Sequence, residues 1–178
     1  ESACLPFEFA TLPEEHVYHP RESLEEDPDF LQLIPYAILR RSDGFVWAYR
    51  RTGGDARLQG RKSIGVGGHV DACDAAEAII ATACKALERE LCEELQTPPP
   101  AVPEQPLGWI NEQSSAVGRV HIGLVWDIAW PDDAPDPQPA EGEKLTGIGF
   151  HPVNSITEQN GFELWSELAC RLILQRNV

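Results

Sequence analysis

Three glutamates and one arginine lie close together in a segment with helical character. The segment reads Arg89-Glu90-Leu91-Cys92-Glu93-Glu94. In a helix, at about 100° per residue, Glu93 and Glu94 lie roughly 60° to one side and 40° to the other side of Glu90, so the carboxylates share one stripe. Like charges at this separation weaken an isolated helix, which indicates a compensating cation. Carboxylate oxygens are hard ligands, which favours Mg²⁺ or Mn²⁺.

The same glutamates have an ordinary alternative explanation. Glu-rich helices are common, and most of them simply carry solvated carboxylates. The apolar stripe of this helix is centred about a quarter turn from the glutamates. Its members are Ile80, Ala83, Cys84, Leu87, Leu91 and Leu95. The helix can therefore pack on a sheet while the carboxylates lie at the border of the packed face.

Signals for the limits of the helix are present on both sides. Asp74 followed by Glu77 forms a capping box, which predicts the helix start near these residues. Pro98-Pro99-Pro100 predicts its end. Residues 63–70 upstream form a short apolar strand whose glycines permit close approach of the backbone. The expected order is therefore strand, loop and helix.

This arrangement resembles the signature of the Nudix hydrolases, Gly-x5-Glu-x7-Arg-Glu-U-x-Glu-Glu-x-Gly-U, in which U is an aliphatic residue. The residues that match its central part position by position are Arg89, Glu90, Leu91, Glu93 and Glu94. Gly67-Gly68-His69-Val70 resembles the glycine-led strand end that opens the signature.

The chain departs from the signature at two places. Between Gly68 and Arg89 lie 20 residues, where the signature has thirteen; an extension of the loop by about two helical turns would explain the difference. Asp74 and Glu77 are both open as substitutes for the first glutamate, although neither matches by spacing. Gln96-Thr97 replaces the final Gly-U pair.

The resemblance implies an α/β fold of the α+β type, a Nudix-like α/β/α sandwich with a mixed sheet between helices. It also implies hydrolysis of a nucleoside diphosphate linked to another moiety, assisted by Mg²⁺ or Mn²⁺. Carried over residue by residue, Glu90, Glu93 and Glu94 are metal ligands, and one of them is a candidate base. Arg89 completes the catalytic set by orienting a glutamate. A backbone carbonyl of Gly68, or of its neighbour Gly67, completes the metal shell.

Other side chains are weaker candidates for the site. Arg50 and Arg51 flank a Gly-rich loop and are the expected substrate-binding residues, with Arg61 as a further contact to phosphate. His69 follows the glycines at the mouth of the expected cleft. Alternative bases and stacking residues, each also explained as surface or core, are Glu112, Glu141, Glu143, Trp47 and Tyr49.

The rest of the chain supplies a sheet and a second helix. Residues 1–30 are expected to form an irregular N-terminal arm, because they are rich in Pro and acidic residues, and 31–178 a single Nudix-like domain. Expected strands are 36–40 and 45–50, joined by a turn with Asp43-Gly44, then 107–110, 117–130 and 145–150; the closing helix is 162–174. This order favours a mixed sheet over a doubly wound parallel one.

The composition and net charge of the chain limit the kinds of binding partner that are expected. Fourteen Lys and Arg against 29 Asp and Glu leave a formal net charge of -15, which repels nucleic acid polymers. A small phosphorylated substrate is compatible, because a bound metal inverts the local charge. The five cysteines lack C-x-x-C spacing and are expected to be reduced. No apolar run reaches the ~20 residues of a membrane span, so the cytoplasm is the expected location. The sequence does not decide between a monomer and a homodimer.

Two function hypotheses stand at this point. The first is an active Mg²⁺-dependent pyrophosphohydrolase. The second is a catalytically inactive Nudix-fold module for nucleotide binding or regulation, which the altered spacing and the missing glycine after the glutamates favour. An isomerase on the same fold and an unrelated α/β protein with a fortuitous glutamate helix are the remaining alternatives.

Overall fold

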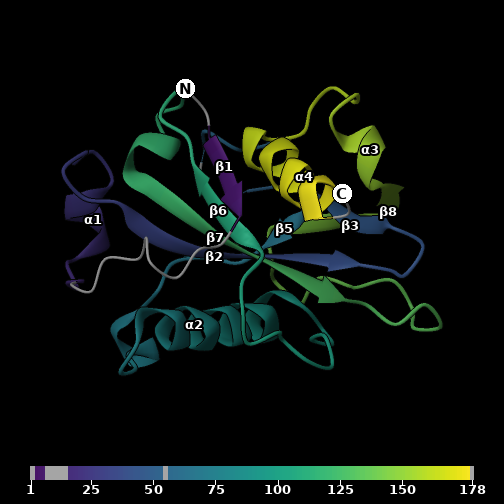
Figure 1. The fold of residues 1–178 in the computed structure, drawn as a ribbon, viewed down its shortest axis with the longest axis horizontal. Coiled ribbons are helices and arrows are strands. Elements are labelled where there is room, and N and C mark those ends of the chain that lie inside the picture. The colour runs from purple at the N-terminus through teal and green to yellow at the C-terminus, as the bar shows by residue number, and fades with distance from the viewer. Residues whose placement is uncertain (1–2, 7–15, 54–55, 177–178) are drawn as a thin grey trace.

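A mixed sheet with helices on both faces forms the core of the molecule (Figure 1). The computed structural model describes residues 3–6, 16–53 and 56–176. The strands are β1 Ala3–Pro6, β2 Gln32–Arg40, β3 Phe45–Arg51, β4 Lys62–Ser63, β5 Gly65–Val66, β6 Gly108–Asn111, β7 His121–Ala129 and β8 Leu145–Pro152. The helices are α1 Arg21–Leu24, α2 Ile79–Glu94, α3 Val153–Ile156 and α4 Leu164–Arg176, with 3₁₀ turns η2 Ala72–Asp74 and η3 Gly118–Val120.

The sheet runs in the order β1-β6-β7-β2-β3-β4, with β5 paired to β2 and β8 paired to β3. β2 and β7 are parallel over their whole lengths, whereas the β2–β3, β6–β7 and β3–β8 pairs are antiparallel. The predicted fold class, a mixed sheet between helices, is therefore confirmed.

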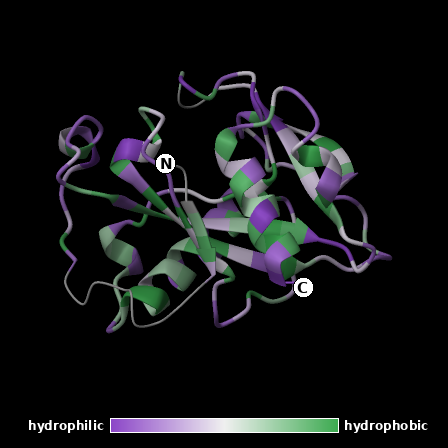
Figure 2. Ribbon diagram, turned by 45° about the horizontal axis from the view of Figure 1, so that its top comes forward, coloured by the Kyte–Doolittle hydropathy of each residue, from purple (hydrophilic) through white to green (hydrophobic). Residues whose placement is uncertain are grey.

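Alternating residues of β2 build two separate hydrophobic layers. Ile38 faces the layer that packs on α4, whereas its neighbour Leu39 faces the layer that packs on α2, because successive side chains of a strand point to opposite faces. Leu87 of α2 and Leu168 of α4 are both fully buried in these layers. Figure 2 shows the hydrophobic residues gathered along the central strands, with hydrophilic residues prevailing in the outer loops. The amphipathic helices predicted from periodicity are confirmed.

The predicted hairpin is also confirmed. β2 and β3 pair antiparallel, with Arg40 opposite Val46. Between them Gly44 has a φ of 84° and donates its N–H to the Arg41 carbonyl at 3.0 Å. The turn needs a residue with positive φ, which explains the glycine at this position.

The long helix starts later than the capping box predicts. α2 begins at Ile79, and the capping box that the structure forms joins Asp71 to Asp74 around η2. The carboxylate of Asp74 accepts hydrogen bonds from Arg89 and from the Asp71 N–H, so it is not available to cap α2. The end of α2 at Glu94, four residues before Pro98, agrees with the prediction.

Two predicted strands are shorter in the structure. The strand expected over 63–70 is divided into β4 and β5 and ends at Val66, because Gly67 turns the chain with a φ of 151°. The strand expected over 117–130 begins only at His121, because the residues before it form the turn η3.

An entirely irregular N-terminal arm over 1–30 is wrong for the residues that the structure describes. Ala3–Pro6 form β1, which pairs antiparallel with β6, and Arg21–Leu24 form the short helix α1. The edge of β6 supplies the backbone hydrogen-bond partners of β1. This pairing is between distant segments, so it cannot be predicted from the pattern of the four residues of β1. Residues 7–15 lie outside the described part. None of the helices in the described part of the chain is long and apolar enough to span a membrane.

Candidate functional site

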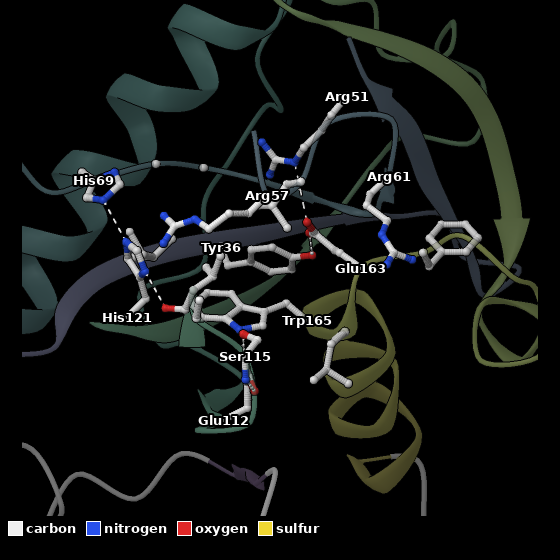
Figure 3. Close-up of a pocket in the computed structure, with 18 of the residues that line it drawn as sticks. Tyr36, Arg51, Arg57, Arg61, His69, Glu112, Ser115, His121, Glu163 and Trp165 are labelled. Atoms are coloured by element: carbon white, nitrogen blue, oxygen red, sulfur yellow. Dashed lines mark hydrogen bonds and ion pairs between the residues drawn. The ribbon is translucent and has the colours of Figure 1, made fainter. Parts of the chain in front are cut away.

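Two cavities meet at the turn that follows β5. The first, called the carboxylate cleft, has a volume of about 980 Å³ and is lined by Arg89, Glu90, Glu93 and Glu94 of α2 together with residues 16–19 and 29–33. The second, called the arginine pocket, has a volume of about 550 Å³ and is lined by Arg21, Arg51, Arg57, Arg61, Glu163 and Trp165, among others (Figure 3). Gly67, Gly68 and His69 line both cavities, so this turn separates a cluster of carboxylates from a cluster of guanidinium groups.

Glycine is required at both positions of this turn. Gly67 has a positive φ, and a Cβ there would collide with the Pro35 carbonyl. A Cβ on Gly68 would lie 2.5 to 2.6 Å from the carboxylate atoms of Glu90. The turn after β5 therefore lies directly against α2.

Arg89 organises the carboxylates around this turn. Its Nη1 donates to Glu90 at 2.8 Å and to Glu93 at 3.1 Å. Its Nε and Nη2 donate to the two oxygens of Asp74 at 3.1 and 2.9 Å, and Nη2 also donates to the His69 carbonyl at 2.9 Å. One guanidinium group thus connects α2, η2 and the glycine turn, which agrees with the orienting role expected for Arg89.

The structure identifies Asp74 as a site residue that the sequence analysis left open. The hydrogen bonds from Arg89 lower the pKa of Asp74, which favours the ionised carboxylate at neutral pH. Counted from Gly68, Asp74 occupies the place of the first glutamate in Gly-x5-Glu. The statement that Asp74 does not match by spacing is therefore wrong on the Gly68 side, and the extra residues lie between Asp74 and Arg89. Glu77, the other candidate, is exposed.

The three glutamates differ in burial and in partners. Burial raises the pKa of Glu90, and Arg89 opposes this effect; Glu93 is exposed and is paired with Arg89. Burial also raises the pKa of Glu94 to about 8, against the positive charge of Arg51 and together with the negative charge of Glu90. Glu94 Oε2 is buried without a hydrogen-bond partner among the described residues. A carboxylate that is costly to ionise is one that a cation would stabilise.

These carboxylates fit a divalent cation by their chemistry. They offer hard oxygen donors, one of them buried and without a hydrogen-bond partner among the described residues, in the cleft that Gly67 and Gly68 also line. Across the described ranges, no three Asp, Glu, His or Cys side chains already converge on one point. Binding of one ion by Glu90, Glu93 and Glu94 together therefore requires rotation of side chains.

Only one of the two predicted substrate-binding arginines lies at the site. Arg51 lines the arginine pocket and faces Glu163, with 3.6 Å between Arg51 Nε and Glu163 Oε2. Arg50 is exposed, donates to the Gly60 carbonyl at 3.2 Å and lines neither cavity. The two residues are neighbours on β3, so their side chains point to opposite faces of the sheet. Arg61 also lines the pocket.

The predicted histidine His69 and the alternative base Glu112 are both engaged by neighbouring side chains. His69 and His121 approach each other, with 3.1 Å between their Nε2 atoms. His121 Nδ1 lies 2.7 Å from the Val117 carbonyl, so Nδ1 carries the proton and its Nε2 accepts from His69. Burial would raise the pKa of Glu112, but hydrogen bonds from the side chains and N–H groups of Ser115 and Ser114 outweigh it, so the pKa of Glu112 is lowered.

The carboxylate of Glu112 is therefore occupied by hydrogen bonds within its own loop and is not positioned as a base. Glu141 and Glu143 are exposed. Trp47 and Tyr49, the candidates for stacking on a base, are about 1% exposed and belong to the layer packed on α2.

Comparison with known proteins agrees with this geometry. No family model matches the chain. Protein YmaB of Bacillus subtilis (strain 168) is 33% identical over 164 residues, which cover 86% of this chain and 76% of YmaB. The chain belongs to the YmaB family. Among solved structures, Tm1382, provisionally named a Nudix hydrolase, superposes with a TM-score of 0.75 at 22% identity, covering 99% of this chain and 90% of Tm1382.

A ligand complex is also among the structures similar to this YmaB-family chain. The NUDIX domain of Shewanella oneidensis NrtR, in complex with ADP ribose, superposes with a TM-score of 0.58 at 15% identity, covering 85% of this chain and 94% of that domain. The predicted resemblance to Nudix proteins is confirmed at the level of the fold.

Proposed function

We propose that this YmaB-family protein is a divalent-metal-dependent pyrophosphohydrolase that cleaves a phosphoanhydride bond in a nucleoside diphosphate linked to another moiety. The observation that carries the proposal is the position of Arg89. It joins Asp74, Glu90, Glu93 and the His69 carbonyl, and so aligns the α2 carboxylates along the turn that both cavities share.

Glu90, Glu93 and Glu94 would hold Mg²⁺ or Mn²⁺, with a carbonyl of Gly68 as a further ligand. Such an ion neutralises phosphate charge and lowers the pKa of a bound water. The chain itself contributes the alignment: Arg89 restrains two of the carboxylates, and Gly68 lets the backbone approach Glu90. Burial raises the pKa of Glu94 to about 8, so a bound cation would favour its ionised form at neutral pH and would couple the charge of the site to metal occupancy.

Arg51 would bind the phosphate groups. Its guanidinium lies in the pocket next to the glycine turn, and it is the positive charge that most opposes the raised pKa of Glu94. Arginine is suited to phosphate oxygens because it donates several hydrogen bonds in one plane. The bound ADP ribose of the NrtR domain supports a nucleotide-type substrate. The net charge of -15 supports a small substrate over a nucleic acid polymer.

Hydrolysis of a panel of nucleoside diphosphate derivatives, with Mg²⁺, with Mn²⁺ and with EDTA, tests the proposal. The double variant Glu93→Gln with Glu94→Gln should lower kcat at least about 100-fold, on the scale seen when groups essential to charge stabilisation are removed. Glu88→Gln is the matched control, since Glu88 is an exposed residue of the same helix. Undiminished activity of the double variant, or no turnover of any diphosphate, would refute the proposal.

An inactive nucleotide-binding module is the second candidate function. Two observations favour it: the long segment between Asp74 and Arg89, and the absence, within the described residues, of three ligating side chains that already converge. Calorimetry with ADP ribose separates the two functions. Saturable binding without product formation supports the module, whereas multiple turnovers exclude it.

A further inference from the structure

Arg51 has a rigidly fixed backbone at the end of β3. Its N–H donates to the Arg61 carbonyl at 3.0 Å, and its own carbonyl accepts from the Gly60 N–H at 2.9 Å. The next residue, Thr52, donates to the Lys144 carbonyl at 2.8 Å. The main chain is therefore held on both sides, and only the side chain of Arg51 is left to be oriented.

The Arg51 side chain lies over the Tyr49 ring, with 5.6 Å from Cζ to the ring centroid, and near the charges of Glu163 and Glu94. Among the described residues, the ion pair of Arg51 is with Glu163, 3.6 Å from Nε to Oε2, and Nε itself is buried without a hydrogen bond. In Figure 3 a dashed line joins Arg51 to Glu163, and other labelled lining residues lie around this pair. No hydrogen bond within the described chain engages the two terminal nitrogens of Arg51, which leaves them available to an anion in the pocket.

The carboxylate of Glu163 is held in place by two hydroxyl groups, one of which contacts a third. Its Oε1 accepts from the Tyr36 hydroxyl at 3.0 Å and from the Ser63 hydroxyl at 2.5 Å, and Tyr36 also contacts the Ser166 hydroxyl at 3.2 Å. Burial, reinforced by the charge of Glu163, raises the pKa of Tyr36 well above its usual value, so the phenol keeps its proton and donates. One carboxylate oxygen is thus fixed by hydroxyls, and the other is presented to Arg51.

The backbone of Glu163 is fixed as well. Its N–H donates to the Lys62 carbonyl at 2.9 Å, and its own carbonyl accepts from the Ser166 N–H at 3.1 Å at the start of α4. The residue is only 7% exposed although it carries a carboxyl group. A buried charge is costly unless it is paired and hydrogen-bonded, so this arrangement requires a reason beyond filling space.

We propose that Glu163 is a positioning residue for phosphate binding: held by Tyr36 and Ser63, it aims the Arg51 guanidinium at the anion that occupies the arginine pocket beside the glycine turn. This inference rests on the proposed function, in which Arg51 is the phosphate-binding arginine. Without Glu163, Arg51 loses its ion pair, regains rotamer freedom and binds phosphate with an added entropic cost. The effect of Glu163 on phosphate binding must therefore depend on the presence of the Arg51 side chain.

Calorimetric titration of the full chain with magnesium pyrophosphate tests this role directly. Glu163→Gln should weaken binding about tenfold, because the amide keeps the size of the side chain and removes its charge. Glu158→Gln, an exposed glutamate before α4, is the control and should bind as the wild type does. In the Arg51→Ala background, Glu163→Gln should cause no further loss. Glu163→Asp keeps the charge with a shorter reach and should show an intermediate loss, which provides a measurement if the glutamine variant does not fold.

Three results would overturn the inference: wild-type protein that does not bind magnesium pyrophosphate, Glu163→Gln that binds like the control, or equal losses with and without Arg51. A residue with a merely structural role would lower the melting temperature but would affect binding independently of Arg51. Kinetics on the diphosphate panel separate this outcome from failure of the proposed function. If binding follows Glu163 but no diphosphate is hydrolysed, the positioning role stands and the enzymatic proposal fails; if hydrolysis occurs, Glu163→Gln should raise KM more than it lowers kcat.

Discussion

The ion pair between Arg89 and Asp74 offers the most direct test of how the site is assembled. Asp74→Asn removes the negative charge but keeps an oxygen that can accept a hydrogen bond. In the wild type, two hydrogen bonds of 3.1 and 2.9 Å join the residues, and the side chains are 23% and 5% exposed. The substitution therefore leaves a largely desolvated guanidinium with fewer anionic partners.

The expected loss follows from the burial of the pair. Breaking a fully buried ion pair by removing one partner costs about 3 to 5 kcal/mol. Arg89 is a quarter exposed and keeps Glu90 and Glu93, so we expect a loss of about 2 kcal/mol in the free energy of unfolding. For a chain of this length, that loss lowers the melting temperature by roughly 4 to 8 °C.

Urea denaturation at neutral pH in EDTA measures the difference. Asp71→Asn is the matched control: its side chain is 68% exposed and lies 3.9 Å from Arg89, so its change should be below about 0.5 kcal/mol. The pKa of Asp74 is lowered, so the stability that this carboxylate contributes is present above the ordinary value of 3.8 and is lost as the pH falls through the lowered pKa. The difference in the free energy of unfolding between wild type and Asp74→Asn should therefore become smaller in acid. Equal losses for the two variants, or a gap that does not change in acid, would refute the reasoning.

Three other perturbations have clear expected outcomes. Gly68→Ala should lower kcat/KM at least about tenfold, because its Cβ would press on the Glu90 carboxylate; kinetics on the best diphosphate substrate checks this, and wild-type rates would contradict it. His121 has a pKa lowered by burial, so its contribution to stability is present above pH 6.5 and is lost as the pH falls. Urea denaturation at a series of pH values on both sides of this value should show a steeper loss of unfolding free energy for wild type than for His121→Asn. Parallel curves of unfolding free energy against pH would argue against this expectation. Burial raises the pKa of Cys170 to about 12, so a thiol reagent should modify the exposed Cys73 in the folded protein and Cys170 only after unfolding; mass spectrometry of the modified peptides would reveal the reverse order.

The features that could be predicted from the sequence are those that repeat along one element. The 3.6-residue period placed Leu87 and Leu91 on the buried face of α2 and the three glutamates at its border. The turn at Gly44 and the hairpin around it follow from turn chemistry within a few residues. The motif beginning at Arg89 was recognisable for the same reason, because its spacing is a property of a single helix.

Contacts between distant segments could not be predicted in this way. The distance of Asp74 from Gly68 was a usable signal in the sequence, but the hydrogen bonds between Asp74 and Arg89, 15 residues apart, appear only in the folded chain. The pairing of Glu163 with Arg51 joins the start of α4 to the end of β3. Such pairs depend on which strands become neighbours in the sheet, and a local pattern carries no information about that choice.

The sequence by itself therefore determined the longer helices and strands, their amphipathic faces and the identity of the carboxylate cluster, but not β1 and α1. Tertiary structure alone decided which neighbour on β3 lines the arginine pocket: the strand alternates, so either Arg50 or Arg51 could point inward, and the packed structure places Arg51 there while Arg50 is exposed. It also decided that Glu94 is partly buried, with Oε2 enclosed, while Glu93 is exposed. The physical reason is that periodicity is a property of one element, whereas burial and desolvation arise only when several elements pack together.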